Sequence, residues 1–393
     1  MKTRENVYKW LESGAAENCN LIADTQNKER IDKEQEKDFG AIENPYEKFF
    51  IYKYLKKVKN TERWNKVWIE IGKVEEDPKK SEKAKKSFEE KANKYKSIKD
   101  PDSNSIRLQE IYQLLWEDVA KKSFMRNDTK KKEMKNIWKD DRKISASDAM
   151  TSVQGVLKAV LKNIAFCDEN MEIGRCIKKV YISCNKITKT QQELWTVLFS
   201  TVVVADLSVA GLDKEFYALI DKNYPNLGEF INNCFTVGNY CPVPKGFNSA
   251  RSGPGACRDY WDITLMKICE WYREEKDESK DRILIELLHD TKDPEIKDNC
   301  KKWLAGFEEN GGWRNFVDTL CMQDYVWNKD DGIDEDDEKY YQVKEFWEDH
   351  NWENPKLPKD AKAIDEALKK INKLTMARIK RIKDRGIQLI NNN

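Results

Sequence analysis

Apolar side chains recur at intervals of three and four residues over much of this chain, a spacing that places them on one face of an α-helix. A helix with one apolar face must bury it against another element, so many such stretches predict a packed multi-helical core. Two examples are Ile111, Leu114, Leu115 and Val119, and Val153, Val156, Leu157, Val160, Leu161 and Ile164. The sequence therefore predicts an all-α or nearly all-α, multi-helical fold.

The composition supplies material for that core. Hydrophobic residues make up 39% of the 393 residues, and the 13 Trp, 15 Tyr and 14 Phe each bury a large area. Disordered chains have few aromatic residues, so a folded protein is expected. Lysine is abundant up to about residue 143, and apolar stripes dominate afterwards. We expect a Lys-rich helical region at 1–143 and a helical core region at 144–393.

Net charge, the length of the longest apolar stretch and the cysteine pattern limit which partners and which cellular compartment can be expected. The 71 Lys and Arg nearly balance the 70 Asp and Glu, so the net charge of +1 gives no indication of nucleic-acid binding. The most apolar stretch, 194–212, is too short and mixed to span a membrane. Ten cysteines occur without a C-x-x-C pair, and the N-terminal residues show no secretory pattern. We expect a cytoplasmic protein with reduced thiols, no metal and no cofactor, and with its partners and oligomeric state left open.

A glycine- and proline-rich segment, residues 238–258, interrupts the helical pattern. Gly238 and Pro244 are expected to hold its backbone on a non-helical path, as one long irregular loop. The loop leads into a helix that Asp259 would cap. Asp262 falls in the first turn of that helix, where a carboxylate suits the positive end of the helix dipole.

Polar side chains on this segment suggest an anion site. Backbone N–H groups at a helix start, preceded by glycines and an arginine, form a natural pocket for a phosphate or a carboxylate. The alternative is a structural loop, in which Asp259 and Asp262 neutralise the arginines and the other polar groups satisfy buried carbonyls. The candidate anion-binding residues are Asn239, Asn248, Arg251 and Arg258.

Further helices are expected on both sides of this segment. The helix that Asp259 would cap extends to about residue 275. Later apolar stripes predict helices at 282–289, 296–307, 313–326, 340–347 and 361–390.

Three stretches carry a resemblance. The segment V-G-N-x-x-x-V-P-x-x-F-N-x-x-R is followed by D-Y-W-D-x-T-L, then by FVDTLCMQDYV at 316–326 and FWEDH at 346–350. Together they resemble a widespread group of uncharacterised bacterial proteins, over roughly residues 145–390. The resemblance implies no activity, because none is known for that group.

The expected function is a binding or interaction protein, and the main alternative is a nuclease in bacterial host defence. Arg282 and His289 are seven residues apart, two helical turns, and resemble the Arg and His of HEPN-type ribonucleases, which need no metal. The G-N…N pattern is also faintly similar to HNH-type nucleases. That chemistry places a histidine before the motif, whereas both histidines here, His289 and His350, follow it.

Overall fold

A computed structural model of the chain describes residues 7, 9–12, 105–126, 145–151, 156, 160, 221–251, 260–355, 357–358 and 360–392. These residues are mostly helical, and within them the only sheet has two strands. The predominantly helical fold is thereby confirmed. Of the apolar stripe predicted at 153–164, the described residues include Val156 and Val160, and both are buried.

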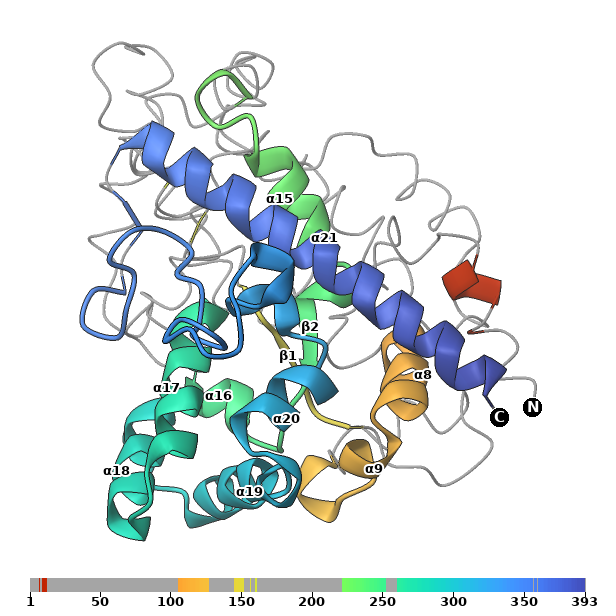
Figure 1. Cartoon of the computed structure of the whole chain (residues 1–393), viewed down its shortest axis with the longest axis vertical. Coiled ribbons are helices and arrows are strands. Elements are labelled where there is room, and N and C mark those ends of the chain that lie inside the picture. The colour runs from red at the N-terminus through yellow and green to blue at the C-terminus, as the bar shows by residue number, and fades with distance from the viewer. Residues whose placement is uncertain are drawn as a thin grey trace, which may run out of the picture.

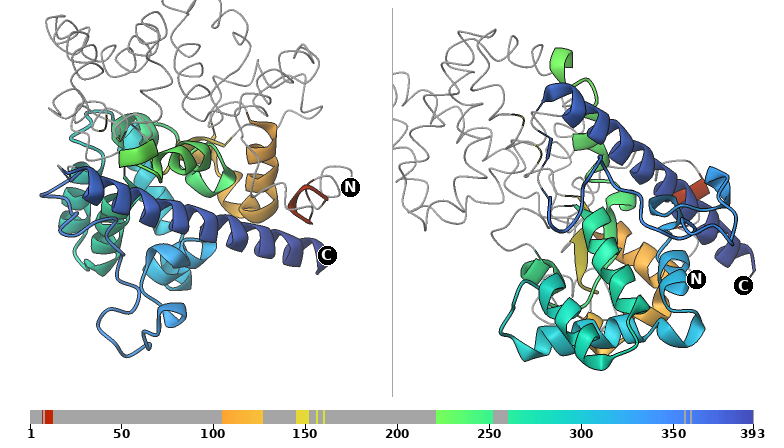
Figure 2. Two further views of the ribbon diagram at one scale, coloured as in Figure 1. Left: turned by 90° about the horizontal axis from the view of Figure 1, so that it is seen from above. Right: turned by 60° about the vertical axis from the view of Figure 1, so that its left-hand side comes forward.

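The longest described helix is α21 (Ala361–Asn391), which runs diagonally across this part of the molecule (Figure 1). Asp360 begins the helix, because its side chain accepts a hydrogen bond from the backbone N–H of Ala363. One face of α21 is buried against α15 (Leu227–Asn233) and α8 (Ile106–Leu115), and α15 lies alongside it in both further views (Figure 2). That face carries Ile364, Leu368, Ile371, Leu374, Ile379 and Ile382. The helix predicted at 361–390 is confirmed.

Four further helices lie together below α21 in Figure 1. They pack through large aromatic side chains: the ring of Trp303 lies 5.2 Å from that of Phe316 and 5.4 Å from that of Phe247. The short helices α9 (Glu117–Ala120) and η1 (Ser123–Met125) adjoin this group, since η1 contacts α19. The four helices are α17 (Trp261–Arg273), α18 (Asp277–Leu287), α19 (Pro294–Ala305) and α20 (Trp313–Thr319), with the 3₁₀ turn η5 (Glu308–Asn310) between the last two.

The sheet pairs strand β1 (Ser147–Ala149) with β2 (Tyr240–Pro242) in antiparallel register. The 3₁₀ turn η4 (Val237–Asn239) precedes β2, and helix α16 (Phe247–Arg251) follows it. The described part of the segment 238–258 is thus largely regular, and the prediction of one long irregular loop is wrong there. Strand β2 of this segment pairs with β1, which lies far away in the sequence. The composition of the segment alone therefore gave no sign of the pairing.

Two predicted helices are also corrected. The helix expected at 313–326 ends at Thr319, because Cys321 adopts a left-handed conformation (φ 56°) before the 3₁₀ turn η6 (Gln323–Tyr325). Residues 340–347 are not helical. Val343 instead forms a β-bridge with Val326. Both departures follow from tertiary contacts that override a local apolar spacing.

A single hydrophobic core joins residues from both of the expected regions. Leu11 and Leu108, from 1–143, belong to the same cluster as Leu227 and Ile379, from 144–393. An antiparallel bridge between Arg126 and Ser145 also crosses the expected boundary. The described parts of the two regions therefore pack as one body.

Gly238 lies where η4 passes against α21, and it is a test of this packing. A Cβ added there would lie 2.5 Å from the Thr375 carbonyl oxygen and 2.5 Å from Cγ1 of Ile379. Because a backbone oxygen moves only if α21 shifts, we expect Gly238→Ala to lower the free energy of unfolding by about 1–3 kcal/mol. Urea titration followed by circular dichroism measures this change.

The matched control for Gly238 is Gly306, at the end of α19. Its added Cβ would meet the Trp303 carbonyl oxygen at an ordinary 3.4 Å, and its φ is −64°. Gly306→Ala is therefore expected to change stability by less than about 1 kcal/mol. Equal stability of the two variants would contradict the close approach of η4 and α21.

Candidate functional site

The structure places Arg251, the main candidate for anion binding, inside the protein. Its side chain is 3% exposed and forms an ion pair with Asp148 of β1, at 2.7 Å from Nη2 and 2.8 Å from Nε to Oδ2. Nη1 also donates to Thr264 Oγ1 at 3.2 Å, and the guanidinium lies over the Trp261 ring. An anion could reach Arg251 only by displacing the carboxylate of Asp148.

The other candidates of this loop either are at least partly buried within the fold or lie outside the described residues. Asn239 is buried, and its side chain bonds the backbone N–H and carbonyl of Thr151 and the carbonyl of Cys234. Pro244 is buried, and its carbonyl accepts from Phe247 at the start of α16. Asn248 is half-buried on α16. Arg258 and Asp259 are outside the described residues, so no open anion site is formed by the candidates that are described.

Asp262 lies in the first turn of α17, as predicted, and it makes a contact that the sequence did not reveal. Its Oδ2 accepts from the Phe346 N–H at 2.7 Å and lies 2.5 Å from His350 Nδ1, with both side chains fully buried. Burial raises the pKa of Asp262, and the hydrogen bond from His350 offsets part of that rise. The N-cap position of α17 is Tyr260, not Asp259. Asp262 thus joins two of the stretches that carry the bacterial resemblance.

Arg282 and His289 do not share a helix face, contrary to the prediction. Helix α18 begins at Asp277 and ends at Leu287, and His289 lies beyond it with a left-handed φ of 53°. Both side chains are exposed. The two groups therefore lack the helical register on which the HEPN resemblance depends.

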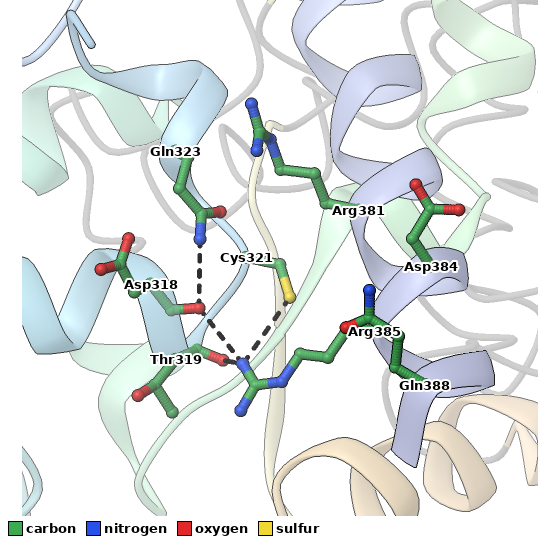
Figure 3. Close-up of a pocket in the computed structure, with 8 residues that line it drawn as sticks. All are labelled: Asp318, Thr319, Cys321, Gln323, Arg381, Asp384, Arg385 and Gln388. Atoms are coloured by element: carbon green, nitrogen blue, oxygen red, sulfur yellow. Dashed lines mark hydrogen bonds between the residues drawn. The ribbon is translucent and has the colours of Figure 1, made fainter. Parts of the chain in front are cut away.

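A polar cavity of about 460 Å³ lies between α21 and the chain that leaves α20 (Figure 3). It is an open hollow, and charged and polar side chains form most of its wall. One side comes from Asp318, Thr319, Cys321 and Gln323, and the other from Arg381, Asp384, Arg385 and Gln388 of α21.

Arg385 reaches from α21 to the C-terminal end of α20. Its Nη1 donates to the carbonyls of Asp318 (3.2 Å) and Thr319 (2.5 Å) and lies 3.9 Å from the Cys321 sulfur (Figure 3). The last carbonyls of a helix lack partners within it and carry the negative end of its dipole, so a cation is stabilised there. Left-handed Cys321 ends α20 at this point and exposes those carbonyls to Arg385.

Arg381, one helical turn earlier, differs from Arg385 in its charge environment. It pairs with Asp324 through Nε, and its Nη2 donates to Asp324 at 3.1 Å and to Asp330 at 2.7 Å. Two carboxylates therefore neutralise Arg381. Arg385 forms no ion pair with a carboxylate among the described residues, and there only its Nη1 has hydrogen-bond partners. Its Nε and Nη2 edge is the one suited to a bidentate anion.

Gln323 lines the cavity beside the end of α20. Its Nε2 donates to the Asp318 carbonyl at 3.4 Å, while its Oε1 is buried and has no hydrogen-bond partner among the described residues. A buried acceptor without a partner costs about 1–3 kcal/mol of stability.

The sequence carries a signal for this cavity in the spacing of three arginines. Arg378, Arg381 and Arg385 recur at intervals of three and four residues within the predicted helix at 361–390. Such spacing places them along one face. Arginines on the same side of a helix as its apolar stripe need internal acceptors, which points to a functional or structural polar site.

The described residues form neither a metal-binding site nor a reactive-thiol site. Within the described ranges, no three His, Cys, Asp or Glu side chains are grouped to hold a metal ion. The five described cysteines, Cys234, Cys241, Cys269, Cys300 and Cys321, are buried and form no disulfide. Burial raises the pKa of Cys269 to about 11. None of the described helices is both long and apolar enough to cross a bilayer.

Comparison with known proteins gives no match from which a function could be inferred. No known protein family matches the chain, and neither a curated protein nor a solved structure is significantly similar to it. The resemblance to uncharacterised bacterial proteins stays a prediction.

Proposed function

We propose that this protein binds a small polar molecule in the cavity between α20 and α21, with an anionic group of the ligand held by Arg385. The observation that carries the proposal is a half-buried guanidinium that has no carboxylate partner among the described residues. Its position in a polar cavity of about 460 Å³ leaves room for a small ligand. The binding function expected from the sequence is kept, and its site moves from Arg251 to Arg385.

The neighbouring contacts support this assignment. The two carbonyl bonds to Nη1 hold Arg385 in one orientation, so little side-chain entropy is lost when a ligand binds the opposite edge. Gln388, one turn further along α21, is exposed and lines the same cavity. The nuclease alternative has no comparable support, because the exposed Arg282 and His289 do not lie on one helix face.

The proposal predicts that Arg385→Gln weakens ligand binding, measured on a panel of small anions and zwitterions. The test compounds are short carboxylates, the common L-amino acids, nucleoside monophosphates and inorganic phosphate. Binding of each compound is detected as a shift in the melting temperature of the protein. A member that stabilises the wild type is then titrated calorimetrically. Loss of one charge-assisted hydrogen bond costs about 1.5–3 kcal/mol, so Kd should rise roughly tenfold to a hundredfold in the variant.

Two further variants separate binding from folding. Lys380→Gln removes an exposed charge from the same helix outside the cavity and should bind as the wild type does. Gln388→Ala changes an exposed cavity residue, so it tests binding if Arg385→Gln disturbs the end of α20. A panel without any stabilising member, or binding unchanged in Arg385→Gln and Gln388→Ala, would overturn the proposal.

A further inference from the structure

We infer that a row of lysines on the outer face of α21 is a docking surface for the phosphate backbone of duplex DNA. The lysine row consists of Lys362, Lys369, Lys373 and Lys380, and all four side chains are exposed. The wall of the cavity contains none of these four described residues. The row is therefore separate from the proposed ligand site, and its test does not depend on that site.

The lysine row is straight. Its members follow one another at intervals of seven, four and seven residues. At about 100° of rotation and 1.5 Å of rise per residue, these intervals keep all four within roughly 20° of one line about 27 Å long. The buried stripe that includes Ile371 and Ile382 lies on the opposite side of α21, toward α15 and α8 (Figure 1). The row therefore faces away from the hydrophobic core.

Most of the positive charge in the row is left without a carboxylate. Within the described part of the chain, Lys369, Lys373 and Lys380 form no ion pair. Lys362 pairs with Glu366, but at 3.8 Å. Like charges along one line repel one another, so an anion that spans several of them is attracted to this face. This attraction is local and does not require a large net charge on the whole chain.

Helix α19 shows what a solvated charged face looks like in the same molecule. Its exposed Lys301 is bonded to Asp281 at 2.8 Å, and Lys302 is bonded to Asp298 at 2.5 Å. Pairing of this kind is the usual arrangement when lysines on a helix serve only solubility and stability. The lysine row of α21 departs from that arrangement.

Duplex DNA is the polyanion that fits the row best. It carries one negative charge per about 1.7 Å of axis, so it presents several phosphates along the length of the row. Single strands are held largely by stacking on aromatic rings, and α21 contains no aromatic residue. Duplex RNA is recognised in part through its 2′-hydroxyls, for which lysine side chains offer no acceptor. A membrane-bound helix inserts its apolar stripe into lipid, whereas the stripe of α21 is buried in the protein.

Fluorescence anisotropy of a labelled DNA duplex, measured with the full chain at several salt concentrations, tests the inference. Lysine contacts to phosphates release counterions, so a row of this size should give a slope of about −3 for log affinity against log salt. A fourfold rise in salt then weakens binding roughly sixtyfold. In the triple variant Lys369→Gln, Lys373→Gln, Lys380→Gln, the slope should fall to about −1, and binding at low salt should weaken at least about tenfold.

The matched control removes three exposed lysines that already have carboxylate partners. The triple variant Lys121→Gln, Lys301→Gln, Lys302→Gln changes the net charge by the same amount and should bind the duplex as the wild type does. Equal weakening in the two triple variants would overturn the inference, as would a wild type that does not bind the duplex at low salt. Tighter binding of single-stranded DNA, duplex RNA or phosphatidylserine vesicles than of duplex DNA would also overturn it.

Discussion

Arg378→Met is expected to lower the free energy of unfolding by about 3–5 kcal/mol, because it leaves three buried backbone carbonyls without a donor. Arg378 lies on α21 and is completely buried. Its guanidinium donates to the carbonyls of Leu320 (3.1 and 3.3 Å), Gly238 (2.8 Å) and Tyr240 (2.8 Å). Methionine fills much of the same volume but leaves these carbonyls without a hydrogen-bond donor. Each unsatisfied buried carbonyl lowers the stability by about 1–3 kcal/mol.

The reason for such a large effect is that Arg378 joins three parts of the fold. Leu320 ends α20, Gly238 lies in η4, and Tyr240 begins β2, so one side chain fixes α21 to each of them. Among the described residues its charge is compensated by carbonyl dipoles and by the Trp116 ring, 5.9 Å away, without a carboxylate.

Urea unfolding of three variants checks the prediction. Arg378→Lys should be intermediate, because an ammonium group is a compact donor and cannot span carbonyls on three elements. Lys380→Met, exposed on the same helix, should change stability by less than about 0.5 kcal/mol. An Arg378→Met variant as stable as the Lys380→Met control would show that these carbonyls are satisfied in some other way.

The helices were predictable from sequence where local signals agreed with the tertiary structure. Helix α21 has a capping Asp360, regular apolar spacing and no proline inside it, so its limits were found almost to the residue. At 313–326 the apolar spacing continued although the helix stopped. The stop at Cys321 requires a left-handed residue without glycine, which is held by contacts with α21.

The site could be predicted only in part, because its partners are distant in sequence. Arg251 was correctly singled out as unusual, but its carboxylate partner is 103 residues earlier, in a strand of three residues. Local reasoning offered Asp259 and Asp262 instead. Asp262 in fact pairs with His350, 88 residues later. Side-chain pairing across such distances depends on the packing of whole elements, which no single sequence window contains.

The second large effect is expected at the Asp148–Arg251 pair, where Arg251→Met should cost about 3–5 kcal/mol of stability. Both side chains are at most 3% exposed, and burial raises the pKa of Asp148, which the guanidinium beside it partly offsets. Without Arg251, an ionised Asp148 would be buried with only the Trp261 N–H as a donor among its described contacts, at 3.2 Å. Arg273→Met, exposed at the end of α17, is the control and should be nearly neutral.

A double-mutant cycle decides between this structural role and an anion-binding role for Arg251. Asp148→Asn keeps an oxygen that accepts from Trp261 but removes the buried charge. Combined with Arg251→Met, it should cost less than the sum of the two single changes, by a coupling energy of about 1–3 kcal/mol. If Arg251 instead served a ligand, Arg251→Met would leave the free protein stable, the two changes would add, and phosphate or carboxylate would stabilise the wild type more than the variant. Because the ion pair is sealed between β1 and α16, we expect coupling between the two residues and no such difference in the response to ligands.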